Sequence, residues 1–146
     1  MFLVRRAAET MDKDIVVAAA QSSFEELLAR PDNDGRLRHV VVEDSGHIIG
    51  VLRVNTALRT PAPGTSPAVP LGQLASRQFT IVREDDVAFD VIRRMWRRGA
   101  MMALVVPQVK GSPRAVPRAT DVLGVITKEH VADSVASSIR VYPMAS

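Results

Sequence analysis

The sequence contains an internal repeat, and this feature restricts the possible folds more than any other. The matched positions 64 residues apart are Ser22 with Asp86, Gly35 with Gly99, and residues 40–42 with residues 104–106. Gly50 matches Gly124 at an offset of 74, so ten extra residues fall in a loop over residues 107–120 of the second copy. Each copy is about sixty residues long and has the pattern β-α-β-β-α. A unit of that size buries little core alone, so we expect the two pseudo-symmetric copies to pack through their sheets into one globular α/β module.

The first copy carries the signals expected for this order of elements. The predicted strands cover residues 14–17, 39–43 and 47–54, and the predicted helices run from Ser22 or Ser23 to Pro31 and over residues 55–59. A serine hydroxyl caps a helix N-terminus, and a proline ends a helix because it lacks the N–H donor. The segment Asp44-Ser45-Gly46 predicts a hairpin turn, with the glycine supplying positive φ.

The second copy repeats the pattern after a proline-rich linker. The predicted strands cover residues 79–82, 102–106 and 122–126, and the predicted helices run from Asp86 to Gly99 and from Lys128 onward. Residues 60–70 contain four prolines and no apolar periodicity, which is typical of a linker. We therefore expect the first repeat at residues 8–59 and the second at 71–141, preceded by a short entry helix or arm over residues 1–13.

The composition indicates an ordinary soluble globular protein, and we expect a cytoplasmic location. The chain has 146 residues, of which 47% are hydrophobic and 24% are charged, with a formal net charge of +3. No cysteine is present, which excludes disulfides, thiol catalysis and thiolate metal sites. No apolar run is long enough to cross a bilayer, and the first residues do not form a signal-peptide pattern. A cytosolic tail of an inner-membrane protein is equally compatible with these features.

No catalytic or metal-binding constellation stands out. His39, His47 and His130 fall on different elements without a metal-ligand spacing, although His39 and His47 could face each other across the hairpin. The paired carboxylates fall in first helical turns or in a turn, where they have structural explanations. The sequence therefore predicts no metal site, no catalytic residue and no enzymatic activity.

Four arginines beside Trp96 form a basic face on the predicted helix before Gly99. Nucleic acid would require interleaved aromatic residues and a broader basic field, so a solvated face or an acidic partner is favoured. Met95, Trp96, Met101 and Met102 also form an apolar cluster.

The junction over residues 121–133 is the best candidate for ligand binding. A short β-branched run passes through Gly124 into Thr127 and then into a predicted helix. Thr127 occupies the place of a helix N-cap, and free N–H groups at a helix start can also hold a phosphate. Capping alone and ligand binding are both open interpretations.

The repeat resembles a tandem CBS-domain pair over nearly the whole chain. The most specific motif is Leu-Gly-Val-Ile-Thr-Lys-Glu-His at residues 123–130, and residues 124–135 further resemble the cytosolic CBS tail of bacterial ClC-type chloride channels and transporters. This resemblance implies a regulatory module that senses an adenosine nucleotide (AMP, ADP or ATP) in the cleft between the repeats. It implies no required cofactor, a homodimer, and a transmembrane channel or transporter domain as partner if the chain is a fragment.

The resemblance also implies site residues. Thr127 takes the place of the hydroxyl that contacts the phosphates, with Lys128 beside it, and residues 80–82 (Thr80, Ile81 and Val82) lie near the base. The usual ribose-binding aspartate is replaced by His130, and in the first repeat Arg53 and Thr56 take the hydroxyl and carboxylate places. Histidine and threonine offer fewer acceptors to a ribose than a carboxylate does. A structural dimerisation module without a small-molecule ligand is therefore the alternative hypothesis.

Overall fold

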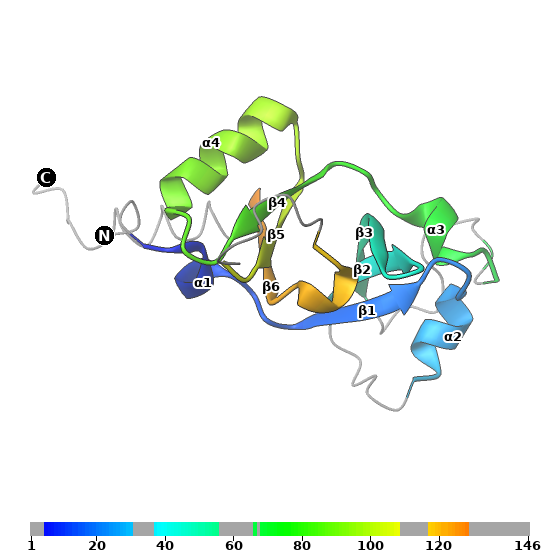
Figure 1. Cartoon of the computed structure of the whole chain (residues 1–146). Coiled ribbons are helices and arrows are strands. Elements are labelled where there is room, and N and C mark those ends of the chain that lie inside the picture. Colours follow the sequence, from blue (N-terminus) through cyan, green and yellow to red (C-terminus); the bar gives the residue numbers. More distant parts are fainter. Residues whose placement is uncertain (1–4, 31–36, 56–65, 67, 109–116, 129–146) are drawn as a thin grey trace, which may run out of the picture. The chain divides into compact units, whose positions relative to one another are not determined.

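The computed structural model describes residues 5–30, 37–55, 66, 68–108 and 117–128, and these form two compact units. Each unit is built on one three-stranded sheet (Figure 1). The β1–β3 unit comprises the described parts of residues 14–77 together with residues 117–121. The β4–β6 unit comprises residues 5–13, 78–108 and 122–128. The predicted fold class, α/β with two repeats, is confirmed, and their packing through the sheets stays a prediction.

The β1–β3 unit has a mixed sheet in the order β1-β2-β3. Its elements are β1 (Ile15–Ala19), α2 (Phe24–Leu28), β2 (Leu37–Asp44), β3 (His47–Asn55), α3 (Leu71–Leu74) and the 3₁₀ turn η2 (Ala119–Asp121). β1 pairs with β2 in parallel, and β2 pairs with β3 as an antiparallel hairpin. The core of this unit packs Phe24, Leu27 and Leu71 against the valines of β1 and β2.

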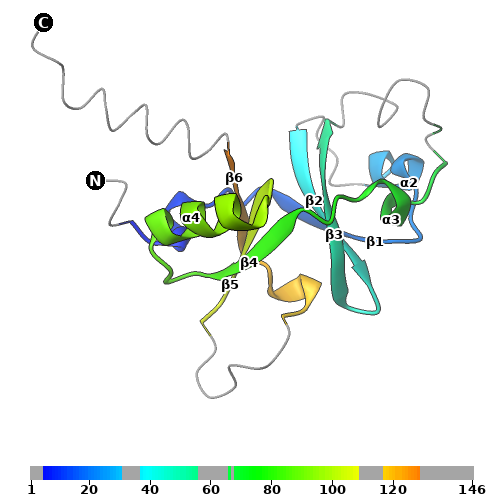
Figure 2. The same ribbon diagram turned by 90° about the horizontal axis from the view of Figure 1, so that it is seen from above.

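The β4–β6 unit has the same sheet topology in the order β4-β5-β6. Its elements are α1 (Ala7–Thr10), β4 (Phe79–Arg83), α4 (Ala88–Arg98), β5 (Met102–Val106) and β6 (Gly124–Thr127). Both views of the ribbon show α4 lying beside the sheet of its own unit (Figure 2). Val91 and Met95 of α4 pack against Val82, Ala103 and Val105 of that sheet.

Turn and cap chemistry agrees with the sequence at three places. The Ser23 hydroxyl accepts a hydrogen bond from the Glu26 N–H at 3.2 Å and so caps α2. Ser45 and Gly46 both have positive φ in the β2–β3 hairpin. Gly99 ends α4 in the left-handed conformation, as predicted.

The strand ladders correct the repeat by one residue. β1 and β4 match at an offset of 64, and β3 and β6 match at an offset of 74. In the first sheet, Val40 pairs with Val16 on one side and with Leu52 on the other. In the second sheet, Ala103 takes the same place between Thr80 and Ile126. The central strands β2 and β5 therefore match at an offset of 63. The predicted match of residues 40–42 with 104–106 is wrong, because a shift of one residue would turn the core side chains of a strand to the opposite face.

The segments that precede the two repeats exchange places. α1 precedes β1 in the chain but packs in the β4–β6 unit, where the Ala7 N–H donates to Asp86 O at 2.8 Å. α3 precedes β4 but packs in the β1–β3 unit, where the Leu71 N–H donates to Ser22 O at 2.7 Å. These two contacts match at an offset of 64. The compact units are thus assembled from separate pieces of chain, whereas the predicted boundaries follow the sequence repeat.

Two predicted details of the second copy are wrong, and one of its elements was missed. Asp86 does not cap α4, because Val87 is the N-cap residue and the Asp86 carboxylate accepts from the Arg83 N–H at 2.8 Å. Residues 122 and 123 precede β6, since η2 occupies the chain just before them. The short helix α3 lies directly after the linker and was not predicted.

Two predicted details of the first copy also change. Asn55 ends β3 instead of starting a helix, and residues 56–59 lie outside the described residues. His39 and His47 do not face each other, because His39 pairs with Arg53 and His47 pairs with Asp44.

Candidate functional site

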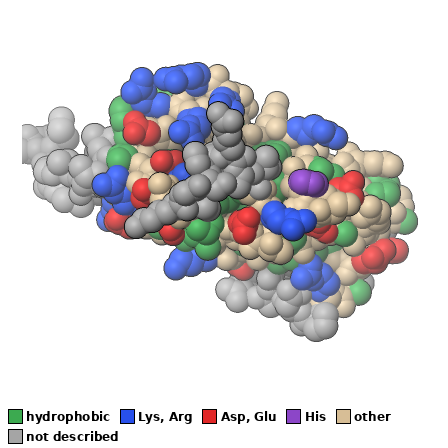
Figure 3. All heavy atoms as spheres, in the orientation of Figure 1, with side chains coloured by type: hydrophobic (Ala, Val, Ile, Leu, Met, Phe, Trp, Pro, Cys, Tyr) green, Lys and Arg blue, Asp and Glu red, His purple; other side chains and the backbone are tan. Residues whose placement is uncertain are grey.

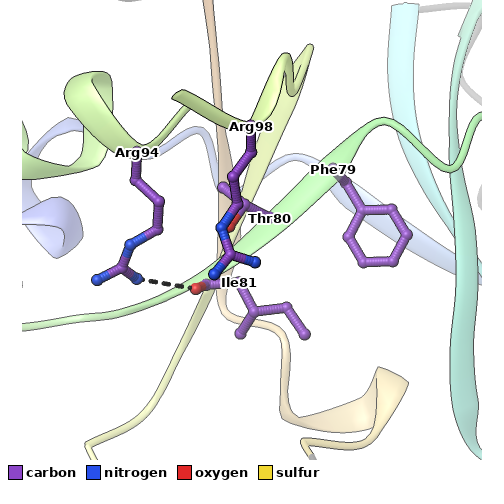
Figure 4. A pocket seen from close by; sticks show the side chains of 5 residues that line it. All are labelled: Phe79, Thr80, Ile81, Arg94 and Arg98. Atoms are coloured by element: carbon purple, nitrogen blue, oxygen red, sulfur yellow. Dashed lines mark hydrogen bonds between the residues drawn. The ribbon is translucent and has the colours of Figure 1, made fainter. Parts of the chain in front are cut away.

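A pocket of about 270 Å³ lies at the edge of the β4–β6 sheet (Figure 4). It is lined by three consecutive residues of β4 and two of α4, namely Phe79, Thr80, Ile81, Arg94 and Arg98. β4 is an edge strand because it pairs only with β5 in this sheet. The pocket therefore combines edge-strand backbone, one hydroxyl and two guanidinium groups.

Arg94 is held in place by two partners within this unit. Its Nη1 donates to the Ile81 carbonyl at 3.1 Å and lies 3.8 Å from a carboxylate oxygen of Asp86 (Figure 4). Both side chains of the ion pair are partly exposed, so solvent screens their attraction. The contact to Ile81 satisfies an outward-facing carbonyl of an edge strand.

The first repeat makes the same contact. Nη1 of Arg30 donates to the Val17 carbonyl at 3.0 Å in the β1–β3 unit, and both residues lie 64 positions before Arg94 and Ile81. A contact that recurs in both units is a feature of the repeat itself. We infer that Arg94 has a structural role at the edge of the strand.

Arg98 differs from Arg94 in this respect. Its side chain is exposed, and it makes no hydrogen bond or ion pair with any residue in the part of the chain that the structure describes. The residue 64 positions earlier in the sequence is Asp34, so the first repeat does not carry a basic residue at this place. The second basic residue of the pocket is therefore specific to the sequence of the second repeat.

Two of the predicted base-binding residues line the pocket. Thr80 is only 4% exposed, and Ile81 is partly exposed on the neighbouring position of β4. Val82 lies instead in the hydrophobic core against α4 and is nearly fully buried. A ligand in the pocket can contact Thr80 and Ile81 directly, while Val82 supports the strand.

Thr127 lies at the same end of the sheet as the pocket. It pairs with Met102 of β5, which in turn pairs with Phe79 of β4, so the three residues form one row across the sheet. Two strand spacings separate the Thr127 and Phe79 backbones by roughly 10 Å. Thr127 is 7% exposed and ends β6, and Lys128 directly after it is exposed.

The remaining predicted site residues do not join this group. His130 lies outside the described residues. Arg53 is exposed on β3 in the β1–β3 unit, where it pairs with His39. Arg94 and Arg98 were missed as pocket residues, although their spacing of four on a basic helix places them on one side of it.

Neither a metal site nor a membrane helix is found within the described ranges. No group of three or more His, Asp or Glu side chains there could hold a metal ion. No helix in those ranges has the length and apolar character needed to cross a bilayer.

Comparison with known proteins identifies the fold. Residues 5–62 match the family model of the CBS domain. No curated protein matches the sequence significantly. Three similar solved structures are the cytosolic domain of the Mg²⁺ channel MgtE in complex with ATP, the CBS domain of a bacterial CNNM/CorC family Mg²⁺ transporter in complex with ATP, and a CBS domain pair in complex with 5′-methylthioadenosine and S-adenosyl-L-methionine.

The fold is that of a CBS-domain pair. The MgtE domain is 22% identical with a TM-score of 0.53, and the alignment covers 85% of this chain but 46% of that one, so the chain spans about half of its length. The CNNM/CorC domain is 19% identical with a TM-score of 0.59, covering 92% and 89% of the two chains. The third structure is 15% identical with a TM-score of 0.58, covering 92% and 98%. The stretch matched by the CBS family model includes α1 and the strands β1 to β3.

Proposed function

We propose that this CBS pair is a regulatory module that binds an adenine nucleotide in its β4–β6 unit. The observation that carries the proposal is the pocket at the β4 edge, which joins Thr80 and Ile81 to a guanidinium without a partner among the described residues. Thr127 ends β6 at the same end of the sheet, within the span of one nucleotide. Two domains of similar fold, the cytosolic domain of MgtE and a CNNM/CorC CBS domain, were solved in complex with ATP, and this supports the ligand class.

The regulated partner that we propose is a membrane ion transporter. Two of the similar structures are domains of Mg²⁺ channels or transporters, and residues 124–135 resemble the cytosolic tail of ClC-type chloride channels. The ClC-type partner rests on that sequence motif alone. A cytoplasmic location follows from this proposal. The nucleotide would regulate the partner only if it bound two states of the module with different affinities.

The test is a thermal-shift titration of the chain with ATP. At about a hundred times the dissociation constant, ATP is expected to add roughly 2.7 kcal/mol of stability, which raises the melting temperature by several degrees. Thr127→Val removes the hydroxyl but keeps the side-chain shape. We expect it to weaken ATP binding about fivefold, because a hydrogen bond to the nucleotide is lost.

Thr120→Val is the matched control, since Thr120 is exposed in η2 of the other unit. This variant is expected to keep the full ATP-induced shift. An unchanged ATP affinity in Thr127→Val would remove Thr127 from the site. The absence of any shift with adenine nucleotides would contradict the proposed function itself.

A homodimerisation module without a ligand is the second candidate. Trp96 is 71% exposed on α4. Phe89, about two helical turns earlier on the same side of this helix, is also exposed. Met95 and Met102 of the predicted apolar cluster are instead buried in their own unit, so only Trp96 and Met101 remain available from it. A dimer in sedimentation equilibrium that Trp96→Ala dissociates, together with no response to nucleotides, would favour this function.

A further inference from the structure

Arg98 is the residue of the pocket whose charge the structure leaves without compensation. Arg94 contacts Ile81 and Asp86, whereas Arg98 has no hydrogen-bonding or ionic partner within the described ranges. Lys and Arg side chains gather over α4 at the top of the space-filling view (Figure 3). Asp86, which contacts this lining through Arg94, also accepts a hydrogen bond from the Arg83 N–H.

The helix dipole does not by itself explain Arg98. A basic side chain in the last turn is favourable near the negative end of a helix, but Arg97 in the same turn meets that need equally. Arg97 is exposed and does not line the pocket. The feature that distinguishes Arg98 is its place beside Thr80 and Ile81 (Figure 4).

The pocket is open to solvent. Its volume of about 270 Å³ is close to the lower end of the roughly 300–1,000 Å³ of typical small-molecule sites. A phosphate group fits in this space. A fork of N–H donors beside a hydroxyl suits the oxygen atoms of a phosphate group.

On the basis of the proposed function, we infer that this pocket receives the phosphate groups of the nucleotide and that Arg98 binds them. The ligand class is then a nucleoside di- or triphosphate. Adenosine and 5′-methylthioadenosine carry no charge, and S-adenosylmethionine carries a net positive one, so Arg98 disfavours them relative to ATP. This places the phosphates beside Thr80 and Ile81, where the family resemblance had placed the base.

The test compares ATP, adenosine and inorganic tripolyphosphate by isothermal titration with the wild-type chain, Arg98→Gln and Arg97→Gln. We expect ATP and tripolyphosphate to lose about tenfold in affinity with Arg98→Gln, while adenosine changes little. Arg97→Gln removes the same charge from the same helical turn and is expected to retain most of the affinity for ATP. Raising the salt concentration is expected to weaken ATP binding more in the wild type than in Arg98→Gln.

The outcomes separate this inference from the proposed function. Equal wild-type affinities for ATP and adenosine would overturn the inference and leave the nucleotide site standing. Equal losses of ATP affinity in both arginine variants would also overturn it, because a general charge effect would then suffice. Tripolyphosphate binding that depends on Arg98, with no gain from the adenosine part of ATP, would support the phosphate site and contradict adenine recognition.

Discussion

Glycine occupies the same place in both sheets because another stretch of backbone crosses it closely. A Cβ at Gly124 would lie 2.6 Å from the carbonyl oxygen of Asp12, and one at Gly50 would lie 2.6 Å from Cβ of Ala75. Next to these glycines, Val125 pairs with Asp12 and Val51 pairs with Ser76 through reciprocal backbone hydrogen bonds. The glycines matched in the sequence repeat are thus explained by the close approach of the segments that precede β1 and β4, which we call the lead-in segments, and not by a special φ.

Gly124→Ala is therefore expected to lower the free energy of unfolding by about 1–3 kcal/mol, as overpacking of a tight contact does. Urea denaturation of the full chain measures this change. Gly50→Ala is the matched variant in the other unit and is expected to act in the same way. Unchanged stability in either variant would show that the crossing segment gives way easily, which would contradict a close crossing.

At the scale of the elements, the sequence predicted what local patterning controls. Apolar runs predicted the two strands of the β2–β3 hairpin, and a hydroxyl residue predicted the Ser23 cap. The preference of glycine for positive φ predicted the end of α4 at Gly99. Asp86 failed as a cap because the residue matching Ser23 is Val87, one position later. A local pattern identifies a polar residue near a helix start but does not fix which backbone N–H it reaches.

The rest depended on contacts between distant parts of the chain. α3 has only four residues and follows a proline-rich stretch, so it is too short to show a helical periodicity in the sequence. It is stabilised by the buried Leu71, which packs with core residues of β1 and β2. The one-residue shift between β2 and β5 becomes visible only in the ladders. The pocket could not be predicted because it forms only where Arg98 of α4 lies beside the edge of β4. The spacing of residues in the sequence does not show how a helix packs against a strand.

At the scale of the whole molecule, the exchange of α1 and α3 makes each unit depend on both halves of the sequence. Ala7 belongs to the core of the β4–β6 unit and Leu71 to that of the β1–β3 unit. Matching hydrogen bonds at an offset of 64 join each lead-in segment to its unit. Neither sequence repeat, cut at its own boundaries, contains all the residues that cover its sheet.

A fragment of residues 14–77 is therefore expected to be more stable than one of residues 14–70, although both contain β1 to β3. Loss of Leu71 from the core alone should cost about 2–5 kcal/mol, since a large buried side chain leaves a cavity. Thermal melting followed by circular dichroism compares the two fragments. Equal melting temperatures would contradict the assignment of α3 to this unit.

The central claim, that an adenine nucleotide binds in the β4–β6 unit at the edge of β4, is tested most directly by nuclear magnetic resonance. A titration of the ¹⁵N-labelled 15.9 kDa chain with ATP reports on each backbone amide. We expect saturable shifts that concentrate at residues 79–81, 94–98 and 127–128, with little change around Arg53 in the other unit. Shifts confined to the β1–β3 unit, or none at a saturating ATP concentration, would contradict it.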